Sequence, residues 1–220
     1  MIYAAYKALG DVLSPEFRAI LWKALGLTIA LFFLLLAGVE AIFYFLTLLP
    51  YPWLETTLAF ATGFGLLVLF FFLMAPVTAM FAGLYLDDVA AKVEAKHYAA
   101  QGIGRPLSLL KGLLVSLQFG LLVLFVNILA LPFIFTGIGA LVLITINAYL
   151  LSRQYFEMAA ARFMAVADAK QFRKDNGFAV FMAGYLPAIM SLVPLLNLIV
   201  PLFATSYFVH LFKRVQKSSV

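Results

Sequence analysis

A short polar segment at the start of the first long apolar run is the strongest candidate for chemistry. Ser14-Pro15-Glu16-Phe17-Arg18 combines a favoured N-cap residue, a favoured first helical residue and a permanent cation one turn further on. Free amide groups at a helix start carry the positive end of the helix dipole, and the guanidinium of Arg18 adds a fork of donors. The segment therefore predicts an oxyanion site. The alternative is that Glu16 offsets the dipole while Arg18 extends to phospholipid head groups.

Three further polar side chains lie in or beside apolar runs and are candidates for lining a solute pathway. Glu40 lies inside the first run, where an ionisable group costs about 3 kcal/mol and therefore indicates a function, unless it reaches the membrane surface or is protonated. Asn197 lies beside Pro194, where a helix break frees backbone groups, although such amides more often link helices by hydrogen bonds. Arg153, directly after the third run, is the last candidate.

One acidic stretch, Asp87 to Glu94, has the composition of a metal-dependent phosphotransferase site but lacks its spacing. No further acidic residue occurs from 95 to 152, where a second set of metal ligands would be needed. The sequence also has no G-x-S-x-G elbow, P-loop or H-E-x-x-H pair. We therefore expect no catalytic residues and no enzyme. The stretch is expected to form an interfacial helix whose acidic residues pair with Lys92 and Lys96.

Metal and cofactor binding are not expected either. The chain has no cysteine, which excludes a disulfide framework, a haem attachment site and a thiolate metal site. Its two histidines, His97 and His210, do not form a ligand pair along one helix, and isolated histidines are usually packed or interfacial. The sequence therefore indicates neither a metal site nor a cofactor.

The composition indicates an integral membrane protein. Of the 220 residues, 65% are hydrophobic and 11% charged, whereas soluble domains have about 45–50% and about 25%. The mean hydropathy is +1.07 and the formal net charge is +5. In a soluble protein that charge would suggest a nucleic-acid partner, but here it indicates membrane topology, and no nucleic acid is expected.

The apolar runs predict one all-α membrane domain, residues 1–220. The runs are 24–49, 58–86, 112–152 and 176–212. The first two have the length of transmembrane helices, whereas the last two are too long for one crossing and must fold back as proline-broken helical hairpins. The bends are expected near 132–139 and at Pro194, with Pro187 and Pro201 also interrupting the last run. Each hairpin either spans the membrane or is re-entrant.

The basic residues predict the orientation of the chain. All 15 lysines and arginines lie in the charged segments 1–23, 87–111, 153–175 and 213–220. By the positive-inside rule, these four segments and both termini are cytoplasmic.

The charged segments are expected to be helical. The first should form an amphipathic helix in the membrane interface, with Lys7 and Asp11 on its polar face. Its apolar face consists of Ile2, Tyr6, Leu9 and Leu13. The third begins with Arg153 and Glu157 at a spacing of four residues, and we expect it to extend the preceding hairpin arm as far as Phe172.

Several short segments, in order along the chain, resemble one transporter family. Val193-Pro194-Leu195-Leu196-Asn197-Leu198-Ile199-Val200-Pro201 resembles that family's Ile-Pro-Leu-Leu-Asn-Leu segment, which is followed by a proline. Ala75-Pro76 with Phe81 and the later Val93-Glu94 are similar to its Ala-Pro-Phe and Val-Glu stretch, and Arg153-Gln154-Tyr155-Phe156-Glu157 to its cytoplasmic segment. The family is that of the CysZ-type sulfate permeases, within the etoposide-induced membrane-protein superfamily.

The resemblance implies a fold and a function. The fold has two long transmembrane helices and two half-inserted helical hairpins, assembled as a homo-oligomer. The function is passive or proton-linked sulfate uptake across a bacterial inner membrane for cysteine synthesis. The family's sulfate motif, Pro-Gly-Leu/Ile-Arg with a common second arginine, corresponds to Pro15-Glu16-Phe17-Arg18. Glu16 stands in place of the glycine, and Ala19 in place of the second arginine.

We therefore predict an inner-membrane anion permease or channel for sulfate or a related oxyanion, in contact with membrane lipids. The predicted binding residues are Ser14, Glu16, Phe17 and Arg18, and the predicted pathway residues are Glu40, Asn197 and Arg153. The alternative is a non-transporting, membrane-organising scaffold of the same fold, which the carboxylate in the anion motif favours because it repels a dianion.

Overall fold

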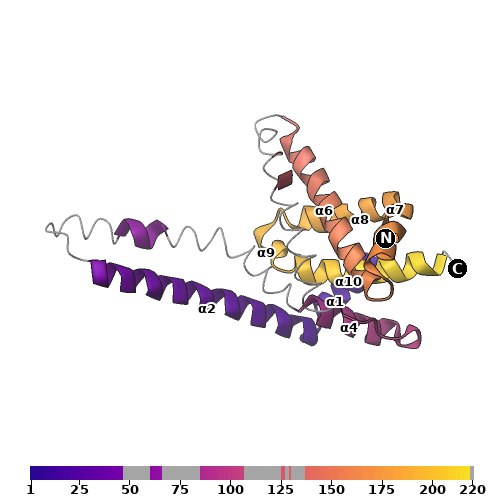
Figure 1. Ribbon diagram of the computed structural model, residues 1–220, viewed down its shortest axis with the longest axis horizontal. Coiled ribbons are helices and arrows are strands. Elements are labelled where there is room, and N and C mark those ends of the chain that lie inside the picture. The colour runs from indigo at the N-terminus through magenta and orange to yellow at the C-terminus, as the bar shows by residue number, and fades with distance from the viewer. Residues whose placement is uncertain (47–59, 66–84, 107–124, 127–128, 130–136, 219–220) are drawn as a thin grey trace.

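Helices account for most of the structure, and turns and loops join them. The computed structural model describes residues 1–46, 60–65, 85–106, 125–126, 129 and 137–218, and no strand occurs among them. Figure 1 shows a bundle of helices beside which both chain ends lie, and one long helix that leads away from the bundle. The predicted all-α fold is confirmed for the described part of the chain.

The long helix is α2 (Pro15–Leu46). It begins at the predicted proline, and its first hydrogen bond runs from the Arg18 amide to the Ser14 carbonyl at 3.1 Å. Residues 24–46 of the transmembrane segment predicted for 24–49 are therefore the later part of a helix that begins at Pro15, and residues 47–49 lie outside the described part of the chain. At 1.5 Å per residue, its 32 residues extend about 48 Å.

The surface of α2 is largely apolar. Pro15–Val39 is the one helix within the described ranges that is long and apolar enough to cross a membrane. Trp22, Phe33 and Leu34 are 64–70% exposed along it, and such a surface is suited to contact with lipid. The second predicted transmembrane helix, 58–86, lies mostly outside the described residues. Its described residues 60–65 are helical.

The first helix, α1 (Ile2–Val12), packs along the last helix, α10 (Val200–Ser218). Its small residues Ala4 and Ala8 are buried in this contact. The predicted apolar face, which carries Ile2, Tyr6, Leu9 and Leu13, is exposed, as an interfacial helix requires. The prediction for Asp11 was wrong, because this carboxylate is 1% exposed and faces α10 rather than solvent.

The last apolar run forms two helices separated by a bend, as predicted. These are α8 (Gly177–Met190) and α10, and the short α9 (Pro194–Asn197) lies between them. Pro187 does not interrupt α8, since packing of the helix against its neighbour compensates for one lost hydrogen bond. Pro201 is the second residue of α10, where a missing amide hydrogen costs nothing.

Helix α10 forms the centre of the bundle. Every residue from Val200 to Lys213 is buried, beneath α1, α4 (Leu86–His97), α6 (Gly139–Ala161) and α8. The expected tail 213–220 therefore does not begin at residue 213, and α10 continues to Ser218. The Lys213 ammonium lies 3.4 Å from the Phe163 ring centroid, and this cation–π contact compensates for its burial.

Helix α6 passes through the predicted boundary at residue 152. It follows a turn at 137–138, within the predicted bend, and ends at Ala161, earlier than the expected Phe172. A separate helix, α7 (Val166–Asp175), follows it. The predicted pair of Arg153 and Glu157 is present at 3.6 Å. The first arm of this hairpin lies mostly outside the described residues.

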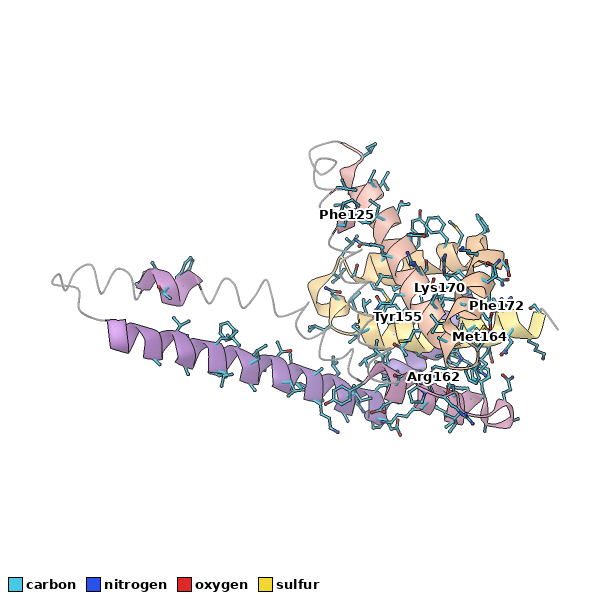
Figure 2. All side chains as sticks on the ribbon, viewed as in Figure 1. Phe125, Tyr155, Arg162, Met164, Lys170 and Phe172 are labelled. Carbon is cyan, nitrogen blue, oxygen red and sulfur yellow. The ribbon has the colours of Figure 1, made fainter. Side chains whose placement is uncertain are left out.

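The expected local pairing along α4 was wrong. Glu94 is fully buried, and its carboxylate accepts a bond of 2.8 Å from the Arg162 guanidinium. Asp87 binds the same guanidinium at 2.7 Å. Figure 2 shows Arg162 where the end of α6 meets α4. A buried carboxylate needs a close permanent cation, which solvent-exposed lysines on its own helix do not supply.

Candidate functional site

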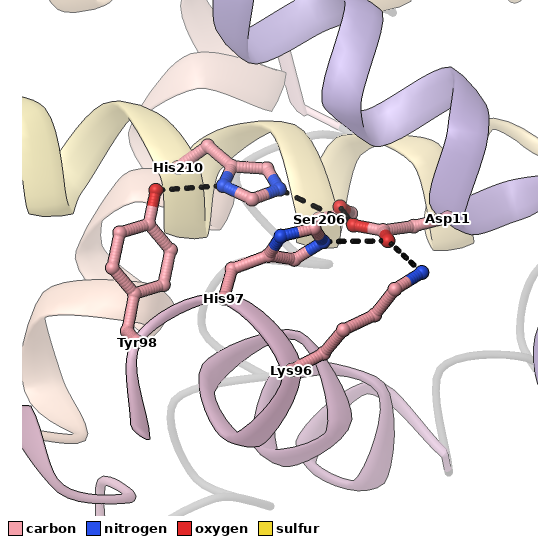
Figure 3. A network of polar contacts seen from close by, with 6 residues as sticks. All are labelled: Asp11, Lys96, His97, Tyr98, Ser206 and His210. Carbon is pink, nitrogen blue, oxygen red and sulfur yellow. Dashed lines mark hydrogen bonds and ion pairs between the residues drawn. The ribbon is translucent and has the colours of Figure 1, made fainter. Parts of the chain in front are cut away.

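A buried carboxylate organises the most polar part of the bundle (Figure 3). Each of the two carboxylate oxygens of Asp11 accepts two hydrogen bonds. Lys96 and His97 reach Oδ1 at 3.0 and 2.9 Å. Ser206 and His210 reach Oδ2 at 2.8 and 3.2 Å. This Asp11 cluster, together with Tyr98, joins α1, α4 and α10.

Local structure places each member of the cluster. Ser206 and His210 are four residues apart, so they share one face of α10. His97 is the last residue of α4, and Tyr98 follows it outside the helix. The Tyr98 hydroxyl lies 2.7 Å from Nδ1 of His210. With that hydroxyl donating to Nδ1, the imidazole is neutral and its Nε2–H donates to Asp11, a tautomer assigned from its partners.

The electrostatics of the cluster favour an ionised Asp11. Burial alone would raise its pKa, but hydrogen bonds from His210, His97, Ser206 and Lys96 outweigh burial and hold the pKa well below its usual range. Burial raises the pKa of Tyr98 to about 12. Lys96 lies 3.0 Å from Oδ1 of this ionised carboxylate of Asp11 and is its partner in an ion pair.

The cluster lies directly before the predicted anion segment. The Ser14 amide donates to the Asp11 carbonyl at 2.9 Å, so the turn into α2 begins at the anchored residue. Glu16 and Arg18 are exposed, whereas Phe17 is 3% exposed and belongs to the core. The Ser14 hydroxyl is shielded from solvent and makes no well-formed hydrogen bond within the described residues, although it acts electrostatically on Glu16.

The basic side of α4 faces this helix start. Lys92 and Lys96 both act electrostatically on Glu16. Together with Arg18 they give the exposed start of α2 three cations near one carboxylate. The repulsion that Glu16 exerts on an anion is therefore partly offset by residues that are distant in sequence.

The predicted pathway residues lie elsewhere. Asn197 is the last residue of α9, and its backbone N–H donates to the Val193 carbonyl at 2.8 Å. Arg153 contacts Glu157, which also binds Arg173 at 2.7 Å. Within the described residues, no hydrogen bond or ion pair links Asn197 or Arg153 to the start of α2. The side chain of Glu40 lies outside the described residues.

Sequence reasoning missed the Asp11 cluster. It treated His97 and His210 as isolated and placed Asp11 on a solvent-facing surface. One local signal was available, because Ser206 and His210 are polar residues on one face of an otherwise apolar run. A buried helix face of that kind needs a polar partner. The identity of the partner, 199 residues away for Asp11 and His210, has no local signature.

Within the described residues, α2 is the one helix long and apolar enough to cross a membrane, and it adjoins a helical bundle. The family described as sulfate transporter CysZ/etoposide-induced protein 2.4 matches residues 4–201. The chain belongs to this family, which is a family of membrane transporters rather than enzymes. The matched range includes Asp11 and His97 but ends before Ser206 and His210. No curated protein matches the chain.

Proposed function

We propose that this protein is a permease or channel for sulfate or a related oxyanion. The family match over residues 4–201 is the observation that carries the proposal. Uptake would supply sulfur assimilation and cysteine synthesis. A bacterial inner membrane, with both termini in the cytoplasm and a homo-oligomeric assembly, is part of the same proposal. The confinement of all 15 basic residues to four segments supports this orientation.

The proposed mechanism is electrostatic. The sulfate dianion approaches the start of α2, where the positive end of the helix dipole attracts it and the exposed Arg18 supplies hydrogen bonds. Lys92 and Lys96 raise the local positive potential and offset Glu16. The Asp11 cluster holds the preceding turn, so that the helix start keeps its direction. Lipid contacts the exposed apolar side of α2.

Beyond this entry, the pathway is proposed to include Glu40, Asn197 and Arg153. The helix is interrupted between α8 and α10, so backbone N–H and C=O groups at this bend lack the partners that a continuous helix would provide. Such groups compensate for part of the lost hydration of the anion without binding it too tightly to leave.

Sulfate flux into liposomes containing the purified protein tests the proposal. Arg18→Gln should weaken apparent sulfate affinity about 10- to 100-fold, since one charge-assisted hydrogen bond contributes about 1.5–3 kcal/mol. Lys23→Gln is the matched control, because Lys23 is a second exposed cation on α2, five residues further on. Glu16→Gly, which restores the family pattern, should increase affinity.

Two results would count against the proposal. Unchanged flux in Arg18→Gln would remove this residue from the mechanism. Flux no greater than in protein-free liposomes would contradict transport itself, and reshaping of the vesicles without flux would favour the membrane-organising scaffold.

A further inference from the structure

The Asp11 cluster, which the transport proposal uses only to hold the turn before α2, contains a set of possible metal ligands. One carboxylate oxygen of Asp11 and one ring nitrogen from each of His97 and His210 lie within 4.8 Å of one another. Asp11 and His210 are 1% and 2% exposed, and His97 is partly buried. These are the only two histidines in the 220-residue chain, and both lie at this carboxylate. Two imidazoles and one carboxylate are typical ligands of zinc and related divalent ions.

The two distances between Asp11 and the histidines are close to ligand–ligand distances around a coordinated ion. Nε2 of His97 lies 2.9 Å from Asp11 Oδ1, and Nε2 of His210 lies 3.2 Å from Oδ2. Ligands at about 2.0–2.1 Å from a tetrahedral ion are about 3.3 Å apart. The widest pair among the three ligand atoms is up to 4.8 Å apart, so coordination requires side-chain rotations that bring this pair about 1.5 Å closer. The three ligands come from α1, α4 and α10, so the ion would bridge three helices.

A second layer of side chains already holds the ligands. Tyr98 binds Nδ1 of His210 at 2.7 Å, which leaves Nε2 to face Asp11. On coordination, the ring proton of His210 would move to Nδ1, and the Tyr98 oxygen would accept it. Ser206 fixes the other side of the carboxylate at 2.8 Å. Hydrogen bonds of this kind orient ligands in metal sites and strengthen binding.

A cation already occupies part of the coordinating region. The Lys96 ammonium lies 3.0 Å from the same Asp11 oxygen that His97 binds, and its side chain is 56% exposed. An exposed lysine can move its ammonium into solvent at little cost. The ammonium groups of Lys7 and Lys213 lie 5.9 and 6.0 Å from the Tyr98 ring centroid, and their positive charges disfavour a metal ion nearby. Binding should therefore be a competition between the ion and an ammonium group.

We propose that Asp11, His97 and His210 form a binding site for a divalent ion of the zinc class. The Lys96 ammonium competes with the ion for Asp11. The ion would join α1 to α4 and α10 immediately before the start of α2. The three ligands bind no anion in the sulfate proposal, although Lys96 takes part in both, and metal binding is measured without sulfate.

Titration of the full-length protein in detergent with Zn²⁺ and Co²⁺, using a purification tag without histidine, tests the site. We expect one ion per chain and a tetrahedral or five-coordinate visible spectrum for Co²⁺. His97→Ala should abolish stoichiometric binding, and Tyr98→Phe should weaken it about 10- to 100-fold through loss of ligand orientation. Lys96→Met should tighten binding. Asp88→Asn, an exposed carboxylate on the same helix, is the control and should leave binding unchanged.

The outcomes separate the proposal from a purely structural cluster. Absence of one-to-one binding in both the natural protein and Lys96→Met would overturn it, and so would binding that His97→Ala leaves intact. Helical circular dichroism of each variant establishes that it is folded. Lys96→Met leaves all three proposed ligands in place, and titration of the natural protein keeps the test decisive even where a variant fails to fold. None of these measurements depends on sulfate transport.

Discussion

Two long apolar helices in this protein, α2 and α10, have opposite surroundings. The candidate membrane span in α2 is 17% buried inside the protein, whereas α10 is buried at every residue from Val200 to Lys213. Both arise largely from apolar runs of the sequence. Apolar content alone therefore does not reveal whether lipid or protein covers a helix.

Polar residues distinguish the two helices. The candidate span of α2 has charged residues at its start and large apolar side chains beyond them. In contrast, α10 carries Ser206, His210 and Lys213 within its buried length, and each has a partner on another element. A buried polar side chain needs a partner, so it fixes which helices surround it. Substitutions should consequently have large effects in the bundle and small effects along α2.

The largest expected effect is at Arg162. Arg162→Ala leaves Glu94, which is fully buried, without its cation. Breaking a buried ion pair by removing one partner costs about 3–5 kcal/mol. We expect a loss of this size in the free energy of unfolding, measured by titration of the detergent-solubilised protein with sodium dodecyl sulfate.

Arg153→Ala is the matched control for this prediction. Arg153 lies on α6, which ends directly before Arg162; it is about one third exposed and pairs with Glu157 at 3.6 Å. Its loss should cost about 0–1 kcal/mol. Equal effects of the two substitutions would show that the buried pair does not hold α4 against α6.

The next largest effect is expected for leucine in the two helices. Leu202 of α10 is 0% exposed, and Leu34 of α2 is 70% exposed. Leu202→Ala should cost about 2–5 kcal/mol because it removes buried methyl groups and leaves a cavity. Leu34→Ala should cost about 0.5 kcal/mol or less in the same titration. A comparable loss at Leu34 would mean that α2 is covered by protein, for example by another subunit.

Local signals predicted several of these elements. Ser14-Pro15 predicted the start of α2, since proline suits the first helical position and the helix does begin there. Pro194 predicted the bend before α10, and the four-residue spacing of Arg153 and Glu157 predicted their contact. Short segments in family order predicted the transporter family, which the match over residues 4–201 confirms.

The interior of the bundle was not predictable in this way. Glu94 and Arg162 are 68 residues apart in the sequence, and the partners of Asp11 come from two other helices. Helical spacing relates residues within about one turn and carries no information on such pairs. The burial of α10 has the same cause, because only the assembled helices show that protein surrounds it. The burial of Phe17, which belongs to the predicted anion segment, was not predictable from the sequence either.

The smallest expected effect is that of adding a methyl group to a glycine in the bundle or in α2. Gly184 of α8 lies so close to Ala148 of α6 that an added methyl group would collide with the Ala148 carbonyl and lie 2.8 Å from the Ser152 side chain. Gly184→Ala should therefore cost about 1–3 kcal/mol, as overpacking usually does. Gly26 of α2 has nothing within 4 Å of the same position. Gly26→Ala should be neutral or stabilise the helix by up to about 1 kcal/mol. Opposite signs for these two changes in one unfolding titration would separate a packed helix surface from one that faces lipid. Equal destabilisation would place a protein neighbour against α2.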